Sequence, residues 1–178
     1  MPYVKFLPET ARMVDLLKSR PGSMKLALQL GQELLRSDSE FTNGERELLA
    51  TYVSALNRNQ YCLLAHAATA KELGIEESIL TTLIEDSEEM LLEEKFIPIL
   101  SYIKKLTLCP SQITKADADA IFDVGWSDHA LSDITFICAW ENMMNRIIEG
   151  HGFQQDFPRS TFEETGKRLA RDGYFATP

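Results

Sequence analysis

Apolar residues recur along the chain at intervals of three and four, which is the spacing typical of α-helices. The clearest stripe lies between Ser23 and Arg36, where Met24, Ala27 and Leu28 begin a series of apolar positions on one face. No segment alternates apolar and polar residues in the manner of a β-strand. We therefore predict an all-α, single-domain helical bundle.

Residues that cap or break helices divide this pattern into segments. Thr42 and Glu45 form a T-x-x-E capping box, and Gly74 is well placed to end a helix that begins near Asn59. The last long helix is apolar on most sides, so we expect it to be central. The expected helices span residues 10–18, 23–36, 42–56, 59–73, 76–84, 93–108, 114–125 and 127–150.

The chain after residue 150 has a weaker helical pattern. We expect weak structure over residues 151–178 and divide the chain into a helical domain (1–158) and a C-terminal arm (159–178). Between the third and fourth helices, Asn57-Arg58 predicts a tight turn in which Asn57 takes left-handed backbone angles. These two helices should therefore pack as an antiparallel hairpin.

The composition excludes several classes of protein. The net charge is −9, so we expect no nucleic-acid partner, and no basic cluster favours a membrane surface. No run of about 18 apolar residues predicts a membrane-spanning helix. The three cysteines are far apart in sequence and the N-terminus lacks a signal peptide, so we expect a cytoplasmic protein.

The residues with the clearest chemical potential are Cys62 and His66. They are four apart, so they share a helix face, and His66 could take the thiol proton. Cys62 also lies near a helix N-terminus, where the helix dipole favours a thiolate. Glu47, on the other helix of the hairpin, should lie at a similar height to His66 and could orient its imidazole.

Around these residues the chain resembles the carboxymuconolactone decarboxylase and alkyl hydroperoxidase D-like superfamily, and most closely its peroxidase-related branch. The resemblance covers roughly residues 8–158. The segments that carry it are Glu45-Arg46-Glu47, Val53 to Asn57, Tyr61-Cys62, Ala65-His66, Leu106-Thr107, Gly125 to Asp128, and Asn145 to Gly152.

This resemblance implies an alkyl hydroperoxidase D-like helical fold in a homo-oligomer. It also implies reduction of a hydroperoxide by a Cys-x-x-Cys pair, with a Glu and a His as proton relay. On this chain Cys62 matches the second cysteine, His66 the His and Glu47 the Glu, whereas Asn59 occupies the position of the first cysteine. Cys62 would then need an external thiol reductant, or Cys109 or Cys138 as a resolving partner. No cofactor is expected.

Each of these residues also has a purely structural interpretation. Cys62 could be a small buried apolar residue, and Glu47 a solvated carboxylate. Asn59 is a candidate for binding substrate through its amide, although a helix N-cap is the better interpretation, and Tyr61 could line a substrate pocket or pack against the hairpin. Asn145 or Arg146 could hold a buried carboxylate such as Glu141 or Glu149, or bond between helices or subunits.

These residues and the family resemblance suggest three alternative functions. The first is a thiol-dependent hydroperoxide reductase of antioxidant type, with Cys62 as nucleophile, His66 as base and Glu47 as orienter. The second is a carboxymuconolactone decarboxylase-like enzyme that uses His66 and Glu47 on another small molecule. The third is a non-catalytic oligomeric family member. A zinc site at Cys62, His66 and Glu47 is a weaker alternative, because no fourth ligand is evident.

Overall fold

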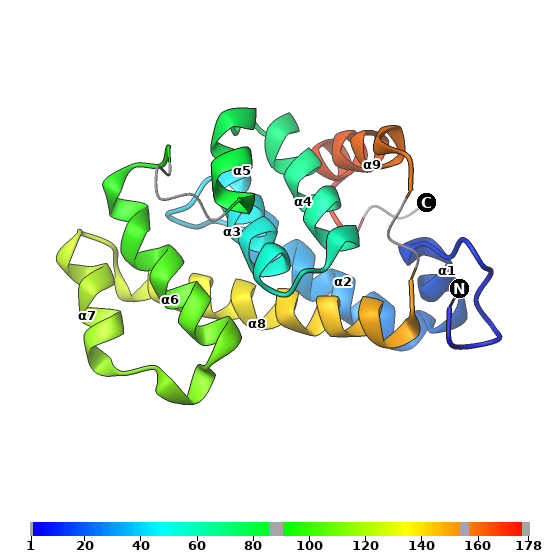
Figure 1. Cartoon of the computed structure of the whole chain (residues 1–178), viewed down its shortest axis with the longest axis horizontal. Helices are drawn as coiled ribbons and strands as arrows, with labels where there is room; N and C mark the ends of the chain where they lie inside the picture. Colours follow the sequence, from blue (N-terminus) through cyan, green and yellow to red (C-terminus); the bar gives the residue numbers. More distant parts are fainter. Residues whose placement is uncertain (1, 86–90, 154–156, 176–178) are drawn as a thin grey trace.

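The structure of the protein is a computed structural model that describes residues 2–85, 91–153 and 157–175. Over these residues it is all-helical, without β-strands, so the predicted fold class is confirmed (Figure 1). Short 3-10 turns precede and follow α6. The α-helices are α1 (Met13–Ser19), α2 (Pro21–Arg36), α3 (Asn43–Leu56), α4 (Gln60–Glu72), α5 (Glu77–Ile84), α6 (Ile97–Leu108), α7 (Lys115–Asp123), α8 (Asp128–His151) and α9 (Arg159–Asp172).

The long helix α8 forms the axis of the molecule, as its apolar sequence predicts. In Figure 1 it runs along the length of the molecule, and helices α2, α3 and α6 pack against it. Ile134, Ile137 and Ile148 are fully buried on α8, together with the polar residues Glu141 and Asn145. The central helix therefore carries polar groups into the core. None of the helices in the described ranges is long and apolar enough to cross a membrane.

Helices α3 and α4 form the predicted antiparallel hairpin. The capping box is present at the start of α3, where the Glu45 amide donates to Thr42 Oγ1 (3.2 Å) and the Thr42 amide donates to Glu45 Oε2 (2.7 Å). The residue in the left-handed conformation is Arg58, at φ 56°, whereas Asn57 is helical at φ −80°. The prediction for Asn57 is thus wrong by one residue, because the last turn of α3 continues through Asn57 before the chain reverses.

The segment after α8 differs from the expectation of a weakly structured arm. Residues 159–172 form helix α9, which packs against α4. Phe162, Gly166 and Leu169 are buried there, and a Cβ atom at Gly166 would lie 2.7 Å from the carbonyl carbon of Ala68. The alanine-rich face of α4 permits this close approach. The prediction missed it because α9 contains few apolar residues, although those it has lie on one face. The proposed division at residue 158 stays a prediction.

Candidate active site

Cys62 lies in the first turn of α4. Asn59 is the N-cap, and its Oδ1 accepts a hydrogen bond from the Cys62 amide at 2.8 Å. The expected N-cap role of Asn59 is therefore confirmed. The Cys62 side chain turns into the core, where the residue is only 5% exposed.

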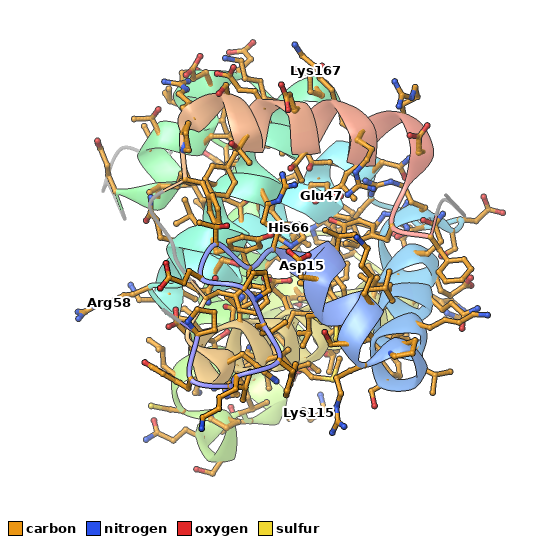
Figure 2. The ribbon with its side chains drawn as sticks, turned by 90° about the vertical axis from the view of Figure 1, so that its right-hand side faces the viewer. Asp15, Glu47, Arg58, His66, Lys115 and Lys167 are labelled. Atoms are coloured by element: carbon orange, nitrogen blue, oxygen red, sulfur yellow. The ribbon has the colours of Figure 1, made fainter. Side chains whose placement is uncertain are left out.

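His66 follows one turn later on the same helix and is also buried. Its Nδ1 lies 2.6 Å from Oε2 of Glu47, which comes from α3 across the hairpin and has no exposed surface. Figure 2 shows Glu47 and His66 next to each other in the interior of the molecule. The short α3–α4 turn therefore places this carboxylate and imidazole at the same height, as the sequence predicts.

The other ring nitrogen of His66 faces a second carboxylate, which the sequence analysis did not assign to the site. Nε2 lies 3.1 Å from Oε2 of Glu141 on α8, within ion-pair distance but without hydrogen-bond geometry. Oε1 of Glu141 accepts hydrogen bonds from Ser54 (2.7 Å) and Asn145 (2.6 Å). Asn145 thus holds a buried carboxylate, which was one of its two expected roles.

Two further groups bind Glu47, one from the end of α2 and one from the segment after α9. Arg36 Nη2 donates to Oε1 at 2.6 Å and also to the carbonyl oxygen of Leu169 at 3.2 Å. The hydroxyl of Tyr174 lies 2.9 Å from both carboxylate oxygens. Glu47 is therefore a fully partnered buried carboxylate, and its interpretation as a solvated helix residue is wrong.

The two carboxylates determine the charge of His66. Burial acts to lower the pKa of His66, but the charge of Glu141 and the contacts with both carboxylates outweigh it and raise the pKa to about 10. Burial likewise opposes ionisation of Glu47, yet the hydrogen bond and charge of His66 lower the pKa of this carboxyl. At neutral pH the site therefore contains an imidazolium between two carboxylates.

Cys62 is in a different electrostatic state from the one expected. Burial raises the pKa of its thiol well above the ordinary value, and the nearby Glu141 charge raises it further. The helix N-terminus contributes only about 0.3–1 kcal/mol in favour of an anion, so it does not offset burial beside a carboxylate. The prediction of a stabilised thiolate is therefore wrong, because burial and the Glu141 charge favour the neutral thiol.

Asn59 and Tyr61 lie beside the site but are engaged elsewhere. Asn59 is fully buried, and its Nδ2 donates to Glu149 Oε1 at 2.9 Å in addition to its capping role. The Tyr61 hydroxyl accepts from the Met13 amide at 3.1 Å, and its ring contacts the edge of Phe162. A substrate-binding role for these two residues stays a prediction.

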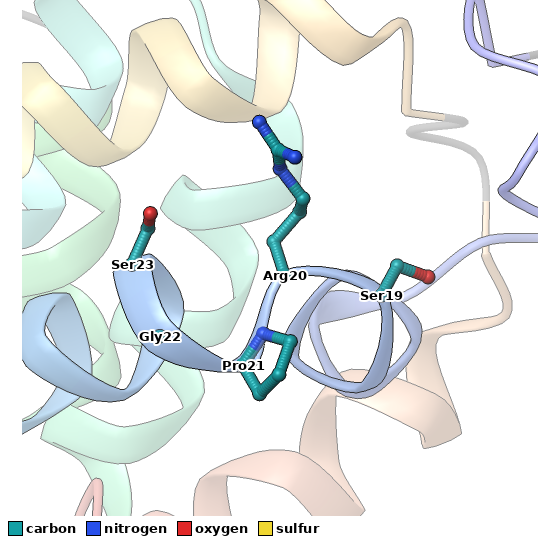
Figure 3. Close-up of a pocket in the computed structure, with 5 residues that line it drawn as sticks. All are labelled: Ser19, Arg20, Pro21, Gly22 and Ser23. Atoms are coloured by element: carbon teal, nitrogen blue, oxygen red, sulfur yellow. The ribbon is translucent and has the colours of Figure 1, made fainter.

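Surface hollows occur away from this cluster. One lies at the junction of α1 and α2 and is lined by residues 19–23 (Figure 3). Another is a groove between α4, α5 and α9, with Leu64, Leu80 and Phe162 among its lining residues. Neither is lined by Cys62, His66 or Glu47. Within the described ranges, no group of three or more His, Cys, Asp or Glu side chains has an arrangement suited to a metal ion.

Comparison with known proteins finds a family match in the part of the chain that contains this cluster. Residues 21–95 match the carboxymuconolactone decarboxylase family, and this range contains Glu47, Cys62 and His66. The predicted family resemblance is confirmed. Among curated proteins, no sequence matches the chain.

Solved structures extend the likeness beyond the segment that matches the carboxymuconolactone decarboxylase family. A peroxidase-related protein from Ralstonia eutropha JMP134 with an alkylhydroperoxidase AhpD core is 23% identical, with a TM-score of 0.78 over 88% of this chain and 82% of its own. A peroxidase-related protein from Silicibacter sp. TM1040 is also 23% identical, with a TM-score of 0.75 over 84% of this chain and 78% of its own. At these identities the likeness establishes the AhpD-like fold.

Proposed function

We propose that the protein is a thiol-dependent hydroperoxide reductase in which Cys62 is the nucleophile. The observation that carries the proposal is a buried thiol beside a charged relay, Glu141–His66–Glu47, built from three different helices. A thiol needs a nearby proton acceptor to become a nucleophile, and a peroxide needs a proton donor for its leaving oxygen. The relay can supply both.

The immediate proton acceptor in this proposal is Glu141. His66 already carries a proton on each ring nitrogen, so it cannot take a third, as the sequence-based role of direct base would require. Oε2 of Glu141 is buried and lacks a hydrogen-bond donor among the described residues. Transfer of the Cys62 proton to this oxygen leaves the net charge of the buried cluster unchanged, which avoids creating an uncompensated charge.

The reaction then balances without a cofactor. The thiolate attacks the distal oxygen of the hydroperoxide ROOH, the O–O bond breaks, and the leaving alkoxide takes the proton from Glu141. The sulfur is oxidised to a sulfenic acid and the hydroperoxide is reduced to the alcohol ROH. Glu141 returns to the carboxylate form, having acted first as base and then as acid.

In this proposal an external thiol R′SH reduces the sulfenic acid. Asn59 stands where a resolving cysteine would lie, and the Cys138 sulfur contacts Thr107 at 3.3 Å. A first R′SH would form a mixed disulfide with Cys62 and release water. A second would release R′SSR′ and restore the Cys62 thiol.

Intact mass spectrometry tests the proposal. The reduced protein is treated briefly with one equivalent of an organic hydroperoxide in the presence of dimedone, followed by peptide mapping. We expect the dimedone adduct on Cys62, and no adduct at that position in Cys62→Ser. Cys109 is the exposed cysteine of the protein, so Cys109→Ser is the control and should consume peroxide as fast as the wild type. Peroxide consumption that survives in Cys62→Ser would show that another group is the nucleophile.

A second candidate is a decarboxylase or lactone-processing reaction, since residues 21–95 match a family named for that activity. Here the His66 imidazolium would supply a proton next to a carbonyl, and Cys62 would be incidental. Turnover of a small acidic lactone that is retained in Cys62→Ser and lost in His66→Gln would favour this reaction. If the wild-type protein neither consumes peroxide nor turns over the lactone, the non-catalytic alternative remains.

We also propose that the chain forms a homo-oligomer, as the family resemblance implies. Light scattering coupled to size-exclusion chromatography would measure its mass in solution. A mass equal to that of one chain across the micromolar range would contradict this proposal.

A further inference from the structure

Tyr174 follows α9 and reaches back to the relay from the far end of the chain. Gly173 permits this return, because it has a left-handed φ of 72°, and the Tyr174 amide donates to Gln32 Oε1 at 2.7 Å. The Tyr174 ring stacks on His66 with 6.0 Å between centroids and 24° between planes. Trp140 meets its edge at 5.6 Å, and the Arg36 guanidinium lies 5.2 Å from its centroid. The ring is thus held by three side chains, and the backbone by a fourth.

The hydroxyl of Tyr174 is directed at the bond between Glu47 and His66. It lies 2.9 Å from each oxygen of Glu47 and 3.0 Å from His66 Nδ1. Burial raises the pKa of Tyr174 well above its ordinary value, and the Glu47 charge raises it further. The hydroxyl therefore stays protonated and acts as a donor to the carboxylate.

This donor matters because Glu47 and His66 share a proton across only 2.6 Å. Other donors that stabilise the carboxylate in its ionised form favour the proton on the imidazole. Arg36 is one such donor and Tyr174 is the other. On the opposite side of the ring, Glu141 adds a negative charge that favours the same imidazolium.

We propose that Tyr174 is a positioning residue of the Cys62 reaction, whose hydroxyl keeps Glu47 ionised and so keeps the shared proton on His66 Nδ1. It does not touch the thiol and acts through Glu47. The consequence for the reaction rests on the proposed function, since a neutral His66 would no longer offset the negative charge that Glu141 and Cys62 share while the proton moves between them. The location of the proton itself does not depend on any activity.

The test compares Tyr174→Phe with the wild-type protein by NMR of histidine labelled with 15N in its ring. The phenyl ring keeps the stacking on His66 but removes the donor. We expect the Nδ1 shift of His66 to move from the imidazolium range toward that of a neutral ring at pH 7.5, as the proton moves to Glu47. Tyr102→Phe is the matched control. The hydroxyl of Tyr102 lies 3.5 Å from the Thr135 hydroxyl on another part of α8, so its removal should leave His66 unaffected.

The kinetic readout is the pH profile of peroxide consumption. Loss of a hydrogen bond to a charged group should lower kcat about tenfold in Tyr174→Phe, with KM unchanged, while Tyr102→Phe matches the wild type. A His66 spectrum in Tyr174→Phe that is identical to wild type would overturn the inference. If instead the spectrum shifts as expected but no variant consumes peroxide, the inference holds and the proposed function fails.

Tyr174→Ala provides a second variant in which water can reach the relay. We expect the His66 pKa to fall from about 10 toward its ordinary value of 6.5, because water screens both carboxylates. Circular dichroism verifies that the helices remain. An unchanged His66 titration in a folded Tyr174→Ala protein would also overturn the inference.

Discussion

His66 and Glu141 meet across the contact between α4 and α8, with Nε2 and Oε2 3.1 Å apart. This contact makes His66 a charged bridge between two carboxylates rather than a free base. The negative charge of Glu141 also contributes to raising the pKa of the Cys62 thiol, and its Oε2 has no hydrogen-bond donor among the described residues. The charge state of the site therefore depends on Glu141 as well as on the pair expected from the sequence.

Replacing Glu141 by Gln should have opposite effects on two reactions of Cys62. Removal of the negative charge lowers the pKa of the thiol, so alkylation by iodoacetamide at pH 8 should accelerate. Peroxide consumption should fall about a hundredfold or more, because the proton acceptor is lost. Both rates can be measured by stopped-flow and mass spectrometry on the same sample.

Glu149→Gln is the matched control for this change. Glu149 lies on the same helix and accepts a hydrogen bond from Asn59, which a Gln oxygen can also do. Its charge has a smaller influence on the Cys62 pKa than that of Glu141. We expect peroxide consumption to persist in this variant. Equal loss in Glu149→Gln and Glu141→Gln would argue against a specific proton-transfer role for Glu141.

Stability should decline as the pH rises above neutrality. The folded protein binds the His66 proton more tightly than the unfolded chain, with a pKa of about 10 against 6.5. This contribution is complete below pH 6.5 and disappears as the pH approaches 10, with a loss on the order of 4 kcal/mol. Urea unfolding at pH 6, 8 and 9.5 measures the slope.

His66→Gln should have a flatter dependence over the same window, because it lacks the titrating group. His129→Gln is the control, since His129 is exposed on α8. It should behave like the wild type. A wild-type stability that is constant from pH 6.5 to 9.5 would mean that His66 is neutral in the folded protein, contrary to its position between two carboxylates.

Introducing a cysteine at position 59 should raise the rate of turnover with dithiols and lower the stability of the folded protein. Asn59→Cys would give Cys62 a resolving thiol, and turnover with dithiol reductants should rise. The substitution also removes the N-cap of α4 and the donor to Glu149, so the reduced form should be less stable by about 1–3 kcal/mol. Urea unfolding with excess reductant measures this cost.

Asn59→Ser separates the two effects. Serine can cap the helix but cannot reach Glu149 as the Asn59 amide does, and it adds no thiol. We expect an intermediate stability and no gain with dithiols. If Asn59→Cys were as stable as the wild type when reduced, the hydrogen bonds of Asn59 would be dispensable.

The contact between α9 and α4 should tolerate no additional carbon atom. A Cβ at Gly166 would lie 2.7 Å from the Ala68 carbonyl carbon, so Gly166→Ala should destabilise the protein by about 1–3 kcal/mol. Gly150→Ala, at the end of α8, meets no atom within 4 Å and should stabilise by about 0.5–1 kcal/mol. Thermal unfolding of both variants provides the comparison, and a stable Gly166→Ala would indicate that α9 can shift.

Local signals explain most of what could be predicted from the sequence. The capping box at Thr42 involves residues three positions apart, and the helix face shared by Cys62 and His66 follows from α-helix periodicity. The height of Glu47 relative to His66 follows from a short turn between two helices. Each of these inferences needs only a few neighbouring residues.

The remaining part of the site depends on contacts that no local pattern encodes. Arg36 from the end of α2 and Tyr174 from beyond α9 bind the same carboxylate, and Glu141 comes from the central helix. The sequence offered one signal for Glu141: it is a charged residue within the apolar pattern of α8. For Tyr174 the available signal was indirect: Phe162 and Leu169, seven residues apart, lie on one face of the helix that positions it, but few other apolar residues support that helix.

This distribution along the chain has a consequence for folding kinetics. Tyr174 and His66 are 108 residues apart, and Arg36 and Leu169 are 133 apart, whereas Glu47 is 11 residues from Arg36 and 19 from His66. The last partners of the charge cluster are therefore supplied by contacts of high sequence separation. Until α9 docks, Glu47 and Arg36 remain hydrated, and desolvation of the cluster should accompany a late step. Hydrogen exchange at the end of α9 would then report whether the charge cluster has closed, independently of catalysis.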